Sequence, residues 1–172
     1  MNRVNDIYFL NQVMEICKDN SLDVYIFGGW AEELWGISTP RLHNDIDLLF
    51  RGENLNPIEK AIYKEKQWKE IIPKRFPHKR AITIDDIMVE FFLVNEGPRG
   101  LYTDFFSIYI IEWPFDTFSH TINLNGEKVN IASKTSLRLY RKNHHYKKEA
   151  YKNYIIEQKV LQERAGKFSA HL

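Results

Sequence analysis

The sequence lacks the features that mark secreted and membrane-spanning proteins. Its 172 residues include one cysteine, Cys17, which has no partner for an internal disulfide or a thiolate metal site. Polar and charged residues interrupt the N-terminal segment, so it has no signal-peptide core, and no run of about 18 apolar residues occurs along the chain. We therefore expect a cytoplasmic protein with no membrane partner, and a buried structural role for Cys17.

The sequence also lacks an excess of charge of either sign. Twenty-four Lys and Arg residues against 23 Asp and Glu leave a formal net charge of +1, which excludes a uniformly basic nucleic-acid-binding surface. Hydrophobic residues make up 44% of the chain and aromatic residues 14%, enough for a substantial core. The length predicts a single domain over residues 1–172, without room for template-binding modules, so no nucleic-acid template is expected.

Helical and strand patterns are intermixed along the chain. Helices are predicted at residues 4–19, 30–35, 57–66 and 133 to about 163, the last with a break near 143–145. Strands are predicted at 24–27, 45–50, 80–84, 88–93, 107–111, 120–124 and 127–131, with hairpin turns at 85–87 and 125–126. Residues 95–100 are predicted to be a loop and a candidate lid. The expected fold class is α/β (α+β), a mixed β-sheet flanked by helices with C-terminal helices.

The segment with the clearest chemistry is the strand that begins at Asp45. Strand periodicity places Asp45 and Asp47 on the same face, with Cα atoms about 6.6 Å apart at roughly 3.3 Å per residue. Two carboxylates held this close repel each other unless a cation lies between them. Magnesium fits, because it prefers oxygen ligands and is held by one or two carboxylates together with substrate phosphates.

A third acidic residue lies in an apolar strand. Glu90 is flanked by Met88, Val89 and Phe91, where a charge needs a partner. If this strand lies beside the strand of Asp45 and Asp47, the three carboxylates could hold two magnesium ions roughly 3.5 to 4 Å apart. The alternative is a structural carboxylate, for instance one paired with Arg80.

Two glycines precede the first aspartate of this site. Gly28 and Gly29 follow a predicted strand and open a helix, so backbone amides there can approach phosphate closely. Carboxylates, magnesium and a phosphate turn together indicate phosphoryl or nucleotidyl transfer.

These residues resemble a known family. Residues 28–31 (Gly-Gly-Trp-Ala), a basic residue in the following loop and residues 43–47 (His-Asn-Asp-Ile-Asp) are similar to the small antibiotic nucleotidyltransferases, the aminoglycoside and lincosamide adenylyltransferases of the DNA polymerase beta-like superfamily. The resemblance implies a nucleotidyltransferase fold in which Asp45 and Asp47 bind magnesium. It implies that Glu90 is a metal ligand, the general base toward the acceptor hydroxyl, or both.

The same resemblance suggests which residues contact the nucleotide. Lys148, next to Glu149, is similar to the Lys-Asp pair with which the family contacts the triphosphate. Many superfamily members carry Gly-Ser where this chain has Gly29 and Trp30, but the antibiotic-modifying branch shares the Trp. The candidate nucleotide-binding residues are Gly28, Gly29, Trp30, Arg41, His43 and Lys148.

Several of these residues have a structural alternative. Trp30 is interpreted first as a core residue at the start of its helix and second as a platform for the base. Arg41 could reach phosphate or remain a solvated loop charge, and His43 could contact the nucleotide or be a hydrogen-bonded structural residue. The basic cluster at 74–75 and 78–80 is interpreted as a solvated edge, with steering of a triphosphate as the alternative.

Charge is distributed unevenly along the chain. Residues 133–164 carry nine Lys or Arg against three Glu, a net charge of +6, whereas residues 1–132 carry −6. We therefore divide the domain into a mixed-sheet catalytic core (1–132) and a C-terminal basic helical segment (133–165). A basic segment facing an acidic, metal-binding sheet would suit a polyanionic nucleotide.

The sequence predicts an enzyme of the nucleotidyltransferase class. A magnesium-dependent enzyme would move AMP from ATP, or another nucleoside monophosphate, onto a hydroxyl of a small acceptor. By resemblance, the acceptor is an aminoglycoside or a lincosamide, and a second copy of the chain is a candidate contributor to acceptor recognition. The alternatives are a toxin–antitoxin component that binds or modifies a protein partner, and a catalytically silent nucleotide-binding module.

Overall fold

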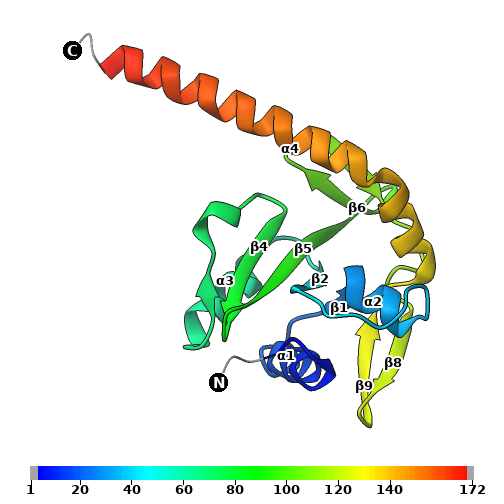
Figure 1. The fold of residues 1–172 in the computed structure, drawn as a ribbon. Helices are drawn as coiled ribbons and strands as arrows, with labels where there is room; N and C mark the ends of the chain where they lie inside the picture. The colour runs from blue at the N-terminus through cyan, green and yellow to red at the C-terminus, as the bar shows by residue number, and fades with distance from the viewer. Residues whose placement is uncertain (1–3, 170–172) are drawn as a thin grey trace.

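The computed structural model describes residues 4–169, with side chains to Glu163. Its helices are α1 (Ile7–Asp19), α2 (Gly28–Leu34), α3 (Asn56–Lys64), the short 3-10 helix η1 (Ile72–Lys74) and α4 (Lys134–Ser169). Its strands are β1 (Val24–Phe27), β2 (Asp45–Arg51), β3 (Lys69–Glu70), β4 (Lys79–Ile84), β5 (Ile87–Gly97), β6 (Gly100–Phe105), β7 (Tyr109–Glu112), β8 (His120–Leu124) and β9 (Glu127–Ile131). Figure 1 shows these elements in place.

The sheet is mixed, as the sequence predicts. Its main path runs β3-β4-β5-β2-β1-β9-β8, and the far end of β5 pairs with β6, which pairs with β7. Strand β2 lies antiparallel to β1 but parallel to β5, and β1 lies parallel to β9. The strands that carry the candidate carboxylates are therefore central, with a neighbour on each side.

Helix α1 illustrates how the core forms. The Asp6 side chain accepts a hydrogen bond from the backbone N–H of Phe9, which caps the helix. Leu10, Val13 and Cys17 follow at helical spacing and are fully buried. Cys17 is thus a core residue, as expected, and burial raises the pKa of its thiol.

Both predicted hairpin turns are confirmed. Asp85 and Asp86 connect β4 to β5 with φ of 48° and 67°, and Asn125 and Gly126 connect β8 to β9 with φ of 51° and 91°. Asp, Asn and Gly tolerate this left-handed backbone, which matches the twist of the flanking strands.

Two sequence predictions are wrong. Residues 95–100 are not a lid, because β5 continues to Gly97 and β6 starts at Gly100, with Asn95 paired to Tyr102 across the hairpin. The C-terminal segment is one continuous helix, not several, and has no break near 143–145. The Asn143 side chain donates to the backbone carbonyl of Leu139, which leaves the helix intact.

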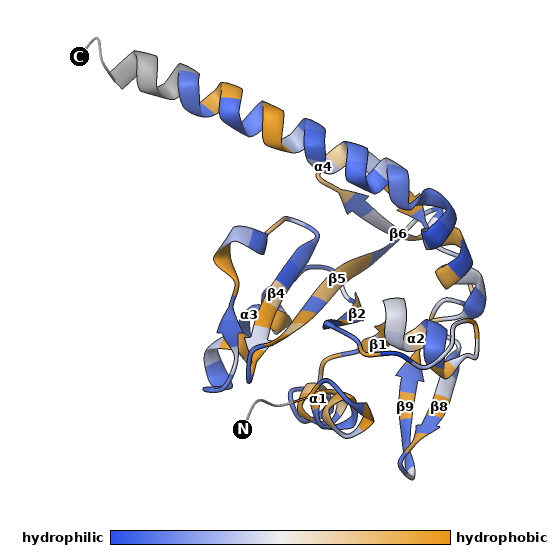
Figure 2. Ribbon diagram, viewed as in Figure 1, coloured by the Kyte–Doolittle hydropathy of each residue, from blue (hydrophilic) through white to orange (hydrophobic). Residues whose placement is uncertain are grey.

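Helix α4 contacts α2, β6 and β7 and then continues past the sheet (Figure 1). Among its side chains that the structure describes, the last buried one is Ala150, and the half-buried Tyr154 packs against Phe106. Figure 2 shows that α4 is mostly hydrophilic, in keeping with its basic composition. Among the described helices, none combines the length and apolar character required to cross a bilayer.

Candidate active site

The register of three neighbouring strands brings the candidate carboxylates together. Asp47 lies opposite Phe27 on β1 and opposite Glu90 on β5. Ile46 and Leu48 are fully buried on one face of β2, so Asp45 and Asp47 lie on the other face, where they are half-buried. The strand of Glu90 therefore lies beside the strand of Asp45 and Asp47, which was the condition for Glu90 to belong to the same site.

Gly28 lies directly against Asp47. A Cβ atom built at Gly28 would overlap the Asp47 carboxylate, and the φ of Gly28 is +62°. Both observations require glycine at this position. The backbone at the start of α2 is therefore in close contact with the Asp47 side chain, with no room for a Cβ atom between them.

The carboxyl group of Asp47 is in an unfavourable environment for a charge. Burial, together with the charges of Asp45 and Glu90, raises its pKa to about 7, although Lys147 and Lys79 oppose this shift. A cation beside Asp45 and Asp47 would relieve this repulsion, so the pair has the chemistry expected of magnesium ligands.

Glu90 has cationic partners that the sequence analysis did not identify. Its Oε1 accepts hydrogen bonds from Lys74 Nζ and Lys79 Nζ, each at 3.0 Å. Burial would raise the pKa of Glu90, but the two lysines lower it below its usual value. Arg80, the partner considered earlier, instead pairs with Glu59. The cluster at 74–80 is therefore not simply a solvated edge.

The described residues contain no group of three or more His, Cys, Asp or Glu side chains arranged to hold a metal ion. The structure therefore places Glu90 beside the aspartates but with its carboxylate directed to lysines. The predicted three-carboxylate metal site is not assembled in this arrangement.

The lysine of α4 that faces the carboxylates is Lys147. Its Nζ donates to the Tyr140 hydroxyl at 2.5 Å and lies 4.9 Å from the centre of the Phe92 ring. Burial and Lys79 lower the pKa of Lys147 to about 8, while Asp47 and Glu90 raise it. Lys148, the predicted contact, is exposed instead.

A signal for Lys147 is present in the sequence. Leu137, Tyr140 and Lys147 follow one another at intervals of three and seven residues, which places them on one helix face. Leu137 is buried, so this face is directed at the sheet.

The remaining candidates form a second group around Gly29. A Cβ atom at Gly29 would lie 2.9 Å from His43 Nδ1 and 3.0 Å from Arg41 Nη2, so both side chains lie over this glycine. Trp30 is buried, its ring centre lies 4.3 Å from that of His43, and its Nε1 donates to Asn5 at 3.2 Å. Trp30 is therefore a core residue, and the structure does not offer its ring to a base.

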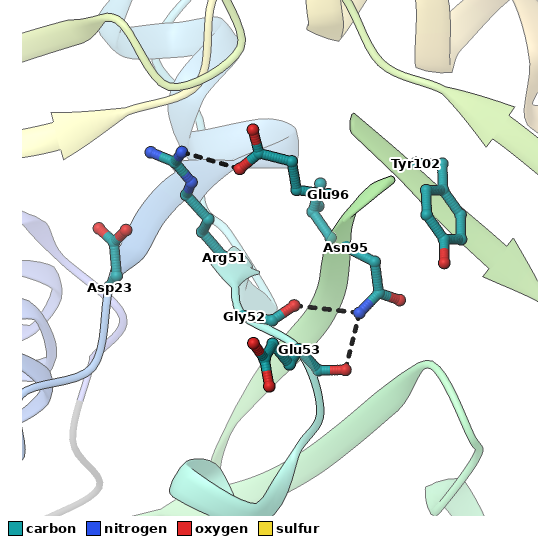
Figure 3. Close-up of a pocket in the computed structure, with 8 residues that line it drawn as sticks. Asp23, Arg51, Gly52, Glu53, Asn95, Glu96 and Tyr102 are labelled. Atoms are coloured by element: carbon teal, nitrogen blue, oxygen red, sulfur yellow. Dashed lines mark hydrogen bonds and ion pairs between the residues drawn. The ribbon is translucent and has the colours of Figure 1, made fainter. Parts of the chain in front are cut away.

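A large cavity lies elsewhere, at the opposite end of β2. It has a volume of about 620 Å³ and opens around Arg51, about 13 Å from Asp47 at roughly 3.3 Å per residue (Figure 3). Arg51 pairs with Glu96 at 3.1 Å, and the Asn95 amide donates to the carbonyls of Gly52 and Glu53. Arg51 and Asn95 are engaged in these interactions, and the paired carboxylates lie at the other end of β2, so we place the candidate active site at Asp45 and Asp47.

Comparisons with known proteins bear on the fold and the family of the chain. Compared by sequence alone, no curated protein matches the chain. Among solved structures, the lincosamide antibiotic adenylyltransferase LnuA with bound lincomycin is similar, with 14% identity, coverage of 88% of this chain and 99% of LnuA, and a TM-score of 0.66. ANT(2'')-Ia in complex with adenylyl-2''-tobramycin is also similar, with 17% identity, coverage of 96% and 98%, and a TM-score of 0.59.

These likenesses confirm the nucleotidyltransferase fold and do not favour the toxin–antitoxin alternative. The sequence itself matches the model of the aminoglycoside-2''-adenylyltransferase family over residues 9–165, which is most of the chain. The protein is therefore an enzyme of the nucleotidyltransferase class and belongs to the aminoglycoside-2''-adenylyltransferase family.

Proposed function

We propose that the protein transfers AMP from ATP to a hydroxyl group of an aminoglycoside or a lincosamide, with magnesium as cofactor. The observation that carries the proposal is the register of Asp47 beside Glu90, with the Gly28 backbone against Asp47. Membership of the family supports adenylyl transfer, and the two antibiotic adenylyltransferases with this fold support the acceptor class. Use of ATP favours the cytoplasm as the place of action.

Asp45 and Asp47 would hold the magnesium. Their mutual repulsion and the raised pKa of Asp47 fit a divalent cation. Bound there, the cation would neutralise charge on the phosphates. Glu90 joins this set only if its carboxylate leaves Lys74 and Lys79, so we assign two aspartates as ligands and leave Glu90 for proton transfer.

The chain's own residues account for the other parts of the reaction. The acceptor oxygen attacks the α-phosphorus of ATP, the bond from that phosphorus to the bridging oxygen breaks, and pyrophosphate leaves. The hydroxyl proton passes to the Glu90 carboxylate, whose lysine partners keep it ionised. Lys147 of α4 is a better candidate than Lys148 to contact the triphosphate, because it is the α4 lysine close to Asp47 and Glu90.

The test is transfer of label from α-phosphate-labelled ATP to a panel of aminoglycosides and lincosamides, read by pyrophosphate release and by the mass gain of one AMP. Asp45→Asn should abolish transfer while the circular dichroism spectrum is unchanged. Asp86→Asn is the matched control, since Asp86 lies in a hairpin turn at φ 67°, which Asn tolerates. Full transfer by Asp45→Asn would overturn the proposal. Label appearing only on a copurifying protein would support the toxin–antitoxin alternative instead.

A further inference from the structure

One carboxylate oxygen of α2 organises the group of residues around Gly29. His43 Nε2 donates to Glu33 Oε2 at 2.8 Å, and the backbone N–H of Arg41 donates to the same oxygen at 3.1 Å. The acceptor is a carboxylate oxygen, so the proton of a neutral His43 ring resides on Nε2 and its Nδ1 carries the lone pair. Glu33 thus fixes both the ring orientation and the tautomer of His43.

The two residues that Glu33 binds both lie close to Gly29. Nδ1 of His43 and the guanidinium of Arg41 are the two groups that crowd the space above Gly29. Glu33 binds both residues: it accepts a hydrogen bond from the ring of His43 and one from the backbone of Arg41. Glu33 therefore holds the His43 ring and the backbone of Arg41 in place beside Gly29.

The Glu33–His43 pair is largely buried. The His43 side chain is only 4% exposed and that of Glu33 18% exposed, and the Trp30 ring covers one face of the imidazole. Trp30 and Glu33 are three residues apart in α2, so they lie on the same face of the helix. The Asn5 amide donates to the carbonyls of His43 and Asp45, which ties this segment to the start of β2.

We propose that Glu33 is a positioning residue for the nucleotide triphosphate, acting through His43 and Arg41. The inference rests on the proposed function and adds to it that the triphosphate lies beside Gly28 and Gly29, next to the two aspartates. A free carboxylate this close would repel phosphate. In Glu33, Oε2 accepts hydrogen bonds from two N–H donors, and it contacts the ring nitrogen of His43 that is not the one close to Gly29.

The neighbouring residue supplies a matched control. Glu32 is on the same helix, and its carboxylate pairs with Arg141 of α4 at 3.1 Å, away from His43. Glu33→Ala and Glu32→Ala remove the same group and the same charge one residue apart. Only the first is expected to weaken nucleotide binding.

The experiment is calorimetric titration of each protein with ATP and magnesium in the absence of acceptor. We expect the Kd of Glu33→Ala to rise at least tenfold and that of Glu32→Ala less than twofold. In turnover, the KM for ATP should rise in Glu33→Ala while kcat and the KM for acceptor change less than twofold. Equal Kd values for the two variants, or an equal rise in both KM values, would overturn the inference.

Two further variants separate positioning from a loss of folding. Glu33→Gln retains an oxygen that can accept from His43 Nε2 and should restore Kd to within threefold of wild type. In the double variant of Glu33→Ala and His43→Ala, the loss should be smaller than the product of the single losses, because Glu33 acts partly through His43. No rescue by Gln, or fully multiplicative losses, would overturn the inference.

The outcome also distinguishes this inference from the proposed function. A wild-type protein that binds no ATP would overturn both. A wild-type protein that binds ATP and transfers AMP, with Glu33→Ala indistinguishable from Glu32→Ala, would overturn the role of Glu33 alone.

Discussion

Asp47 and Glu90 are register partners on parallel strands, yet their pKa values shift in opposite directions. Burial and two neighbouring carboxylates raise the pKa of Asp47, whereas Lys79 and Lys74 overcome burial and lower the pKa of Glu90. The lysines therefore neutralise one member of the pair and leave the other without a direct cationic partner among the hydrogen bonds described. This difference separates a candidate metal ligand from a candidate proton acceptor.

The first prediction concerns magnesium and thermal stability. A cation that binds the folded protein and relieves the repulsion at Asp45 and Asp47 raises the melting temperature by mass action. At pH 7.5, millimolar magnesium without nucleotide should raise Tm by roughly 2–4 °C, equivalent to about 1 kcal/mol. Asp47→Asn removes one ligand and the repulsion, so its Tm should respond little to magnesium.

The control for this prediction is again Asp86→Asn, which should respond to magnesium as wild type does. A shift in Tm that is the same in Asp47→Asn and in wild type would show that magnesium acts elsewhere, and the assignment of Asp47 as a ligand would then fail.

The second prediction isolates the close approach of Gly28 to Asp47. Gly28 and Gly36 both have positive φ, 62° and 68°, but a Cβ at Gly36 would meet no atom within 4 Å. Gly36→Ala should therefore cost only the backbone strain, about 1 kcal/mol in urea unfolding. Gly28→Ala carries the same strain and also displaces the Asp47 carboxylate, so AMP transfer should fall at least a hundredfold.

If the rate of AMP transfer by Gly28→Ala were within a few-fold of the rate for Gly36→Ala, the Asp47 carboxylate could be displaced without loss of activity. The position of Asp47 would then not depend on the glycine.

Local patterns in the sequence predicted much of this structure. The spacing of Asp45 and Asp47 with buried Ile46 between them predicted strand β2, and Asp85-Asp86 predicted the turn of the β4–β5 hairpin. These features depend on neighbours within a few residues, which is the range in which periodicity and turn chemistry act.

The parts that sequence analysis missed depend on distant partners. Lys79 lies on the same face of β4 as Ala81, the register partner of Glu90, whereas Arg80 lies on the other face. Lys74 contacts Glu90 from η1, which the sequence does not place beside β5. The single continuous helix α4 is another example. Propensity at 143–145 favoured a break, but Asn143 bonds within the helix and Tyr140 and Ala150 pack on either side of it.

The third prediction separates two adjacent lysines. Lys147 faces Asp47 and Glu90, whereas Lys148 is exposed on α4. Lys147→Ala should reduce kcat/KM for ATP at least tenfold, and Lys148→Ala should change it less than twofold. Steady-state kinetics with ATP varied at saturating acceptor would measure both. A larger loss in Lys148→Ala would return the triphosphate contact to the lysine first predicted from the sequence.

The last prediction concerns His78, a buried residue whose two ring nitrogens have no hydrogen-bond partner among the described residues. Its ring lies among Phe76, Phe105 and Phe106, and burial, followed by the charges of Lys147, Lys79 and Arg80, lowers its pKa from 6.5 to about 3.

Between these two pH values the unfolded chain binds a proton that the folded protein does not, so stability falls as the pH drops below 6.5. The slope is about 1.4 kcal/mol per pH unit. His78→Phe removes this contribution. We compare the free energy of unfolding of His78→Phe with that of wild type by urea denaturation at pH 8 and at pH 5. The difference, variant minus wild type, should be about 2 kcal/mol larger at pH 5 than at pH 8. His145→Phe, which changes an exposed histidine, should leave the difference between the two pH values unaltered. An equal pH dependence in His78→Phe and wild type would mean that the folded protein accommodates the proton at His78, contrary to the cationic and aromatic surroundings that the structure gives it.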